Sequence, residues 1–154
     1  MNKNTKNKVI PESFSINHSV MPAPQVRKAG LLSGPGGDKL SKFDLRFLKP
    51  NVEAMPTAAI HTLEHLLAMF LRENLENIID LSPMGCRTGF YLTVWGDVVI
   101  KDVQDALCKS LEQVLKIKHS DVPGLSEKEC GNYRDHSLFS AKEYARKVLE
   151  GFKK

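Results

Sequence analysis

The segment Thr57–Asn74 limits the possible folds of this 154-residue chain more than any other. Its apolar residues recur every three or four positions, which is the spacing of a helix that packs one side against a sheet. These residues are Ile60, Leu63, Leu67, Phe70 and Leu71. Thr57 follows a proline and is a good N-cap candidate, because its hydroxyl can accept a hydrogen bond from the first turn. The sequence therefore predicts a long, buried helix.

The other side of this helix carries three groups that can bind a metal or transfer protons. His61, Glu64 and His65 are spaced by three and four residues, so they share one helical face around Ala68. A single histidine on such a helix is usually an ordinary core or surface residue. Two imidazoles one turn apart can instead reach one tetrahedral ion while neutral. The helix thus favours metal binding, and a third ligand must come from elsewhere in the chain.

Cys130 is the first candidate for that third ligand. It lies in an irregular stretch next to a glycine, which suits a ligand delivered by a loop. With His61 and His65 it would form a two-His, one-Cys site with one open position, the pattern of a catalytic rather than a structural metal. His119 and His136 are competing candidates that the spacing does not exclude.

The two other cysteines have different settings. Cys86 lies in the loop 82–89, which enters a predicted strand, and Arg87 follows it directly. A nearby cation favours the thiolate, which is the form that acts as nucleophile or base. Cys86 is therefore a candidate reactive thiol, with an ordinary loop cysteine as the alternative. Cys108 lies at the margin of the apolar stripe of a second helix, and we expect it to pack as a small hydrophobic residue.

The remaining hydrophobic patterns predict an α+β fold. Strands are expected at residues 12–16, 25–32, 42–48, 78–81 and 89–95, and helices at residues 102–118 and 140–151. A glycine-rich loop at 33–38 predicts a hairpin, and a capping box at 140–143 opens the last helix, which Gly151 can close. We therefore expect a single domain, residues 11–154, with a largely antiparallel sheet packed against helices. Residues 1–10 are expected to form a flexible basic leader.

Composition excludes several classes of partner. The formal net charge of +4 comes largely from lysines and arginines near the two ends, and the middle of the chain lacks the basic stripe with interleaved aromatics that nucleic-acid binders show. The longest apolar run, residues 66–71, is too short for a membrane span. The leader has no apolar signal region, and the number of cysteines is odd. We therefore expect a cytoplasmic protein with reduced thiols.

Five segments taken together resemble the S-ribosylhomocysteine lyase (LuxS) family. They are E-S-F at 12–14, K-F-D-L-R-F at 42–47, H-T-L-E-H-L-L at 61–67, I-D-L-S-P-M-G-C-R-T-G-F at 79–90 and E-C-G at 129–131. The segments are spread over most of the chain from about residue 11 onward. The H-x-x-E-H core alone is not specific, but the combination of the five segments is.

The resemblance implies a particular reaction and assembly. It implies metal-dependent cleavage of S-ribosylhomocysteine to homocysteine and 4,5-dihydroxy-2,3-pentanedione, by successive carbonyl migrations and a β-elimination. The second product is the precursor of an autoinducer used in bacterial quorum sensing, and the reaction also recycles methyl-cycle waste. The family's metal is Fe(II), for which Zn or Co can substitute. The resemblance further implies a homodimer with its active sites at the subunit interface.

The resemblance also assigns roles to residues of this chain. It implies a metal held by His61, His65 and Cys130, and an acid/base pair formed by Glu64 and Cys86. Positions associated with the family's substrate pocket match Ser13, His18, Arg46 and Asp80.

Two other functions fit parts of the pattern. An H-x-x-E-H helix also resembles the inverted zinc peptidases, in which the glutamate activates a metal-bound water. Those enzymes use a downstream carboxylate as third ligand and are much larger than this chain. A non-enzymatic metal-binding protein, in which Cys86 is incidental, is the second alternative.

Overall fold

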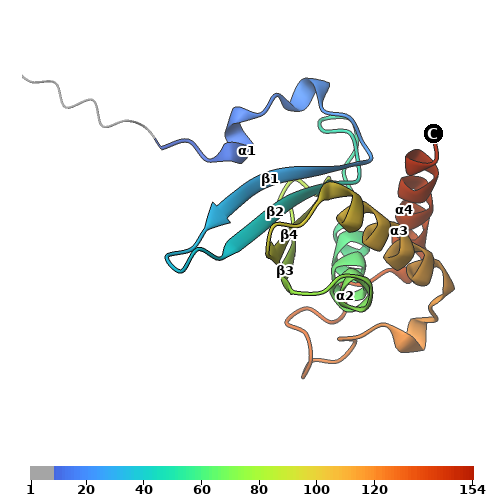
Figure 1. Cartoon of the computed structure of the whole chain (residues 1–154). Coiled ribbons are helices and arrows are strands. Elements are labelled where there is room, and N and C mark those ends of the chain that lie inside the picture. The colour runs from blue at the N-terminus through green and yellow to red at the C-terminus, as the bar shows by residue number, and fades with distance from the viewer. Residues whose placement is uncertain (1–8) are drawn as a thin grey trace, which may run out of the picture.

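A four-stranded antiparallel sheet forms one layer of this computed structural model, which describes residues 9–154 (Figure 1). The strands follow the order β1 (Gln25–Ser33), β2 (Lys39–Arg46), β4 (Gly89–Trp95) and β3 (Ile78–Pro83). Every neighbouring pair is antiparallel. The predicted α+β fold with a largely antiparallel sheet is confirmed, as are the predicted strands from 25, 42, 78 and 89. The predicted leader falls mostly on residues 1–8, which lie outside the described residues.

Three long helices form the second layer, namely α2 (Thr57–Asn74), α3 (Ile100–Lys116) and α4 (Leu138–Phe152). Helix α2 contacts both other helices and strand β3. Its apolar side is buried as predicted, with Leu63, Leu67 and Leu71 fully inaccessible. The sheet supplies the facing side chains, among them Phe43 and Phe90. This packing leaves the histidine-bearing side of α2 turned away from the sheet, toward the chain between α3 and α4.

The predicted strand at 12–16 is wrong, because these residues form the short helix α1 (Glu12–Ser15). Pro11 starts the turn, and its carbonyl accepts a hydrogen bond from the N–H of Phe14 at 3.0 Å. The Ser15 hydroxyl also donates to the carbonyl of Glu12 at 2.7 Å. Phe14 is exposed, so the apolar residues of this segment do not form the buried face that a strand would need. A second short turn, η1 (His18–Val20), follows before β1 begins.

Two predicted helix starts differ from the structure. Thr57 is the first residue of α2 rather than its cap, since Pro56 occupies the N-cap position, and the Thr57 hydroxyl donates to Asp135 at 3.3 Å. Helix α4 begins at Leu138, two residues before Ser140, where the expected capping box starts. The Ser137 hydroxyl, three residues before Ser140, accepts from the Ser140 N–H at 3.2 Å. The helix also continues through Gly151 to Phe152.

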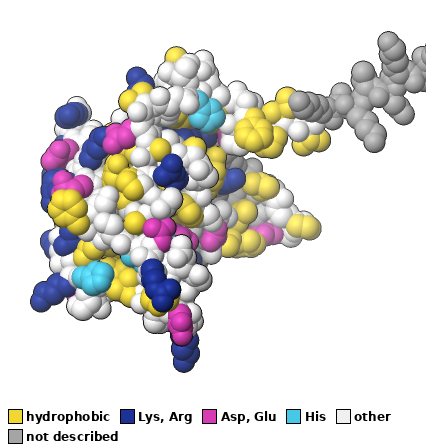
Figure 2. Space-filling model, turned by 180° about the vertical axis from the view of Figure 1, so that it is seen from behind, with side chains coloured by type: hydrophobic (Ala, Val, Ile, Leu, Met, Phe, Trp, Pro, Cys, Tyr) yellow, Lys and Arg dark blue, Asp and Glu magenta, His cyan; other side chains and the backbone are white. Residues whose placement is uncertain are grey.

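Charged and apolar side chains are mixed over the surface. On the face shown in Figure 2, cationic and anionic side chains are interspersed, and apolar side chains gather where the chain leaves the described residues. None of the helices within residues 9–154 is long and apolar enough to cross a membrane.

Candidate metal centre and thiol cavity

Four side chains bring nitrogen and sulfur atoms together beside α2. His61 and His65 come from the helix, and Cys130 and His136 come from the segment that connects α3 to α4. One ligand atom of each residue lies within 4.8 Å of the others. Cys130 Sγ lies 3.3 Å from His61 Nε2 and accepts from the N–H of Asn132 at 3.4 Å. The structure therefore brings together the three predicted ligands and one of the two competing candidates.

Backbone carbonyl groups fix the tautomers of the two helical histidines. His61 Nδ1 lies 2.8 Å from the carbonyl oxygen of Asp135, and His65 Nδ1 lies 2.7 Å from that of Pro123. A carbonyl oxygen can only accept a hydrogen bond, so each Nδ1 must carry the proton. The lone pair of each ring is therefore on Nε2, the atom that faces the cluster. Such a carbonyl partner also orients the ring, as is usual for metal-binding histidines.

The hydroxyl of Thr62 fixes His136 in the same way. This hydroxyl has one proton, which it donates to the carbonyl of Ala58 at 2.8 Å. It must therefore accept at its 3.0 Å contact with His136 Nδ1, and it also accepts from the N–H of Ser137 at 2.9 Å. His136 Nε2 is left as a buried lone pair without a hydrogen-bond partner among the described residues. Burial, together with the neighbouring histidines of the cluster, lowers the pKa of His136 to about 4.

The ring positions separate His136 from the two helical histidines. The rings of His61 and His65 are nearly perpendicular, with centroids 4.6 Å apart. The ring of His136 is stacked on His61 at 4.0 Å, with an interplanar angle of 22°. Two imidazoles on one tetrahedral ion have centroids about 5 Å apart when the metal–nitrogen bonds are about 2 Å long. Stacked rings also direct their lone pairs side by side rather than to one point. His119 lies in the turn η2 (His119–Asp121) and is not part of the cluster.

A glycine allows the connecting segment to approach α2. Gly124 has a φ of 77°, and a side chain on it would place its Cβ 2.5 Å from the His65 ring. Glycine is the residue that adopts this backbone conformation readily. The preceding residue is Pro123, whose carbonyl holds His65. The Pro-Gly pair is a recognisable turn signal in the sequence, and it could have indicated this close approach.

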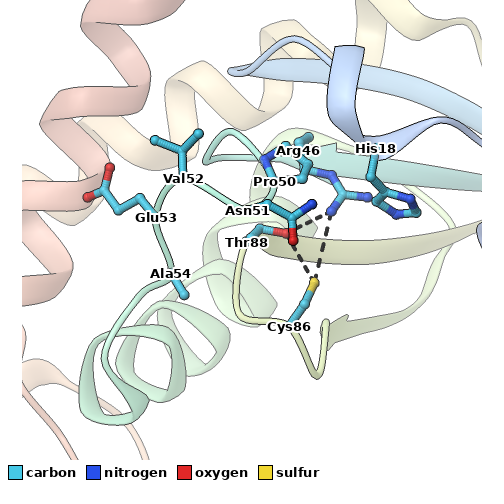
Figure 3. Close-up of a pocket in the computed structure, with 9 residues that line it drawn as sticks. All are labelled: His18, Arg46, Pro50, Asn51, Val52, Glu53, Ala54, Cys86 and Thr88. Carbon is cyan, nitrogen blue, oxygen red and sulfur yellow. Dashed lines mark hydrogen bonds between the residues drawn. The ribbon is translucent and has the colours of Figure 1, made fainter.

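The second group of functional candidates surrounds a cavity of about 630 Å³ on the β2–β4 side of the domain (Figure 3). Its walls include Cys86 and Thr88, from the loop between β3 and β4, and Arg46, from the end of β2. The loop is close to Arg46 because the register of the sheet pairs Arg46 with Gly89. His18 and the loop 50–54 complete the walls. Ser13 lines a smaller adjoining hollow together with His18, Arg46 and Cys86.

Buried charges hold Arg46 in place. Its guanidinium contacts both carboxylate oxygens of Asp44, at 3.1 Å from Nε and 2.7 Å from Nη2. Arg46 is 2% exposed and Asp44 is fully buried. Arg27 donates to the same carboxylate at 3.0 Å. This paired arrangement leaves Arg46 Nη1 free to donate to the hydroxyl of Thr88 at 2.7 Å.

The environment of Cys86 favours the thiolate. Partial burial would raise the pKa of this thiol, but hydrogen bonds from the side chain and backbone of Thr88 and the charge of Arg46 lower it below the ordinary value. The prediction that Arg87 would favour the thiolate is wrong, because the nearby charge is that of Arg46. The Arg87 guanidinium donates to the carbonyl of Met55 at 2.9 Å instead. Burial raises the pKa of Cys108, which packs against the core as predicted.

The predicted site residues Glu64 and Asp80 do not line these cavities. Glu64 is on α2, partly buried, on the side that carries the histidines. Asp80 is exposed on β3, where its carboxylate accepts from the Ser82 hydroxyl. Neither is among the described residues that line the two cavities around Cys86. The same is true of His61, His65 and Cys130, so the metal candidates do not line either of these two cavities in the same chain.

These features define a class, namely a small α+β protein with a His–Cys cluster suited to a transition metal and a separate activated thiol. Comparison with known proteins identifies the family. The family model "S-Ribosylhomocysteinase (LuxS)" matches residues 11–154. The chain therefore belongs to the LuxS family.

Individual relatives agree with this assignment. The chain is 58% identical over 139 residues to the S-ribosylhomocysteine lyase of Clostridium botulinum, covering 90% of this chain and 91% of the relative. The identity and coverage are the same for the S-ribosylhomocysteine lyase of Clostridioides difficile. For that of Lactobacillus acidophilus the identity is 53% over 140 residues, covering 90% of this chain and 89% of the relative.

Proposed function

We propose that this protein is a lyase that cleaves S-ribosylhomocysteine to homocysteine and 4,5-dihydroxy-2,3-pentanedione. Its family and its relatives, which are named as S-ribosylhomocysteine lyases, support this activity. The observation that carries the proposal is the cluster beside α2, where two fixed imidazole lone pairs and a thiol converge. The cluster contains a sulfur and no carboxylate among its described members, which argues against the zinc-peptidase alternative.

We assign the metal ligands to His61, His65 and Cys130. The donor set of two imidazoles and one thiolate suits Fe(II), Zn and Co, and it leaves one position open. The stacking of His136 on His61 supports a place for His136 beside the metal rather than on it. A bound ion would supply Lewis-acid polarisation of the sugar carbonyl. We propose Fe(II) as the metal of the working enzyme, with Zn or Co as substitutes.

Glu64 and Cys86 are the proposed proton-transfer groups. The carbonyl must move from the first to the second carbon of the ribose and then to the third. Each shift removes a proton from one carbon and returns a proton to the carbon that carried the carbonyl, so the chain must both accept and donate protons. With the carbonyl at the third carbon, the proton of the fourth carbon is acidic. Its removal allows the thiolate of homocysteine to leave the fifth carbon by β-elimination.

The substrate-binding residues proposed are Ser13, His18, Arg46 and Asp80. Three of them, Ser13, His18 and Arg46, line the hollows next to Cys86, and this position supports contact with the sugar or its homocysteine substituent. Arg46 can hold an anionic or hydroxyl group there because Asp44 fixes its guanidinium. The assignment of Asp80 rests on the family resemblance.

We further propose a homodimer in which each active site combines residues of two subunits. Two observations support it. The metal candidates do not line the cavity of Cys86 in the same chain, so a second copy can bring the two together. Apolar side chains are also exposed here, including Val52 at 71%, which lines this cavity, and Phe14 at 78%, which lines the adjoining hollow. An exposed apolar group of this kind is typical of a surface that a partner covers.

Mixing two inactive variants tests the shared site. We expect Cys86→Ala and His61→Ala to be inactive alone, and co-refolded protein to recover about a quarter of the parental activity, since half of the dimers would hold one intact site. If each site belongs to one chain, the mixture would stay inactive. Sedimentation that shows only a 17.2 kDa species at micromolar concentration would contradict the dimer itself.

The activity is tested on protein purified without oxygen and loaded with Fe(II), Zn or Co. Addition of S-ribosylhomocysteine should release a free thiol, measured with Ellman's reagent, and a dicarbonyl, measured by trapping with a diamine. Loaded protein that releases neither product would contradict the proposal.

The three cysteines are unpaired, which supports a reducing cytoplasmic location. In that setting the dicarbonyl would serve as the signal precursor and homocysteine would return to the methyl cycle.

A further inference from the structure

The hydroxyl of Thr88 lies between the buried cation Arg46 and the sulfur of Cys86 (Figure 3). Arg46 Nη1 is 2.7 Å from Thr88 Oγ1, and Thr88 Oγ1 is 3.1 Å from Cys86 Sγ. The direct separation of Arg46 Nη1 and Cys86 Sγ is 4.0 Å. Each of the two contacts made by the hydroxyl is therefore shorter than the direct contact between the cation and the sulfur.

The direction of these hydrogen bonds follows from the chemistry of the groups. A guanidinium can only donate, so the hydroxyl oxygen of Thr88 accepts from Arg46. The proton of that hydroxyl is then available to the neighbouring sulfur of Cys86. The hydrogen bond from Arg46 polarises the hydroxyl of Thr88 and so strengthens the hydrogen bond that this hydroxyl donates to Cys86. An anionic thiolate accepts such a hydrogen bond better than a neutral thiol does.

We propose that Thr88 is a positioning residue that transmits the charge of Arg46 to Cys86 and holds its sulfur as an oriented, hydrogen-bonded thiolate. This inference rests on the proposed function in so far as Cys86 is a proton-transfer group there. The hydrogen-bond partner of the Thr88 hydroxyl is thus the thiolate of Cys86, and Thr88 need not contact the substrate.

The position of Thr88 is rigid enough for this role. The residue is 3% exposed, and its carbonyl accepts from the N–H groups of Phe47 and Leu48 at 2.9 and 3.0 Å. The next residue, Gly89, packs so closely on β2 that an added Cβ would lie 2.1 Å from the Leu45 carbonyl oxygen. Loop and strand are therefore joined by the main chain, and the hydroxyl of Thr88 can be changed without removing these contacts.

Other titratable groups line the two cavities that Cys86 lines, or pair with residues that do. They are Arg46 and Asp44 on β2, His18 on η1, Tyr91 on β4 and Glu53 in the loop 50–54. A test must therefore change the hydroxyl alone and leave all five in place.

Replacing Thr88 by valine removes the hydroxyl and keeps the shape and the backbone. The pKa of Cys86 is measured in the full-length, metal-loaded protein, from the rate of iodoacetamide alkylation at each pH. Peptide mapping separates Cys86 from Cys108 and Cys130. We expect Thr88→Val to raise the pKa of Cys86 by about one unit, because a hydrogen bond to the charged form is lost.

Two further variants keep this test decisive. Thr88→Ser restores the hydroxyl and should return the pKa to the parental value. Thr93→Val makes the same change on β4, away from the loop that carries Thr88, and should have no effect. Equal pKa values in the parent and Thr88→Val, or an equal rise in the valine and serine variants, would overturn the inference. The measurement needs no substrate, so it is independent of the proposed reaction. That reaction fails if Cys86→Ala releases homocysteine at the parental rate, whatever the pKa.

Discussion

The two candidate functional regions of this protein, the histidine cluster and the surroundings of Cys86, are held in place by different kinds of contact. In the histidine cluster, main-chain carbonyls of Pro123 and Asp135 orient the rings of His65 and His61. Around Cys86, side-chain charges orient the thiol, since Asp44 holds Arg46 and Arg46 holds Thr88. In the histidine cluster the imidazoles bind an ion as neutral groups, so the thiolate of Cys130 is the one charged ligand among the three proposed. The region around Cys86 contains a buried cation, Arg46, that is already held in place without substrate.

This difference determines how each region responds to substitution. A carbonyl contact cannot be removed by changing a side chain, so the cluster should lose function mainly through its own ligands. The chain of side chains at Cys86 can be broken at each link. We therefore expect severe but local effects at the cluster, and effects on both stability and chemistry around the thiol.

The largest expected effect is the loss of metal when a proposed ligand is removed. Each of the variants His61→Ala, His65→Ala and Cys130→Ala leaves two donors, and metal content after dialysis should fall from about one ion per chain to near zero. Elemental analysis measures it. Cys108→Ala and His119→Ala are the controls and should keep the metal. Full metal retention in Cys130→Ala would refute the assignment of this ligand.

The next effect concerns stability at the other region. Asp44→Asn keeps the shape of the side chain but leaves the buried Arg46 and its neighbour Arg27 without their shared counter-charge. Removing one partner of a buried ion pair costs about 3–5 kcal/mol, so the urea midpoint should fall markedly. Asp105→Asn, which breaks only the exposed pair with Lys101, should leave the midpoint nearly unchanged. Equal midpoints for the two variants would show that the buried pair does not stabilise the fold.

The sequence predicted the cluster better than its supports. Periodicity placed His61 and His65 on one face, and the loop setting of Cys130 made it a ligand candidate, before any tertiary contact was known. The carbonyls of Asp135 and Pro123 could not be predicted, because every residue has a carbonyl and only the path of the chain selects two of them. The contact of Thr62 with His136 joins residues 74 positions apart and has no local signal.

The elements show the same division. The sequence predicted a strand at 42–48, but did not indicate that its charged residues Asp44 and Arg46 would be buried. At α4, Ser137 and Ser140 are both possible N-caps in the sequence. In the structure Ser137 is the N-cap, because its hydroxyl accepts from the N–H of Ser140. At α1 a short alternating pattern was misread, since five residues do not distinguish a strand from a turn after a proline.

A smaller effect, on rate alone, should come from the two proposed proton-transfer residues. Glu64→Gln and Cys86→Ala each remove a group that accepts or donates protons, while the three proposed metal ligands remain. Homocysteine release should fall about a hundredfold or more, the usual scale for a lost acid or base. Metal content and circular dichroism should match the parent. Cys86→Asp should retain a trace of activity, because a carboxylate can still carry a proton.

The smallest effect expected is at His136, and it decides whether this residue is a ligand or a neighbour of the site. His136→Ala removes the ring stacked on His61, and Thr62→Val removes the hydroxyl that fixes the ring. Loss of an outer partner typically lowers metal affinity by about tenfold to a hundredfold, so both variants should still bind one ion per chain in excess metal. X-ray absorption of the cobalt-loaded parent should show two imidazoles and one sulfur. Three imidazoles, or a loss of metal in His136→Ala as complete as in Cys130→Ala, would make His136 a fourth ligand. The open position required for Lewis-acid chemistry would then have to come from displacement of that ring.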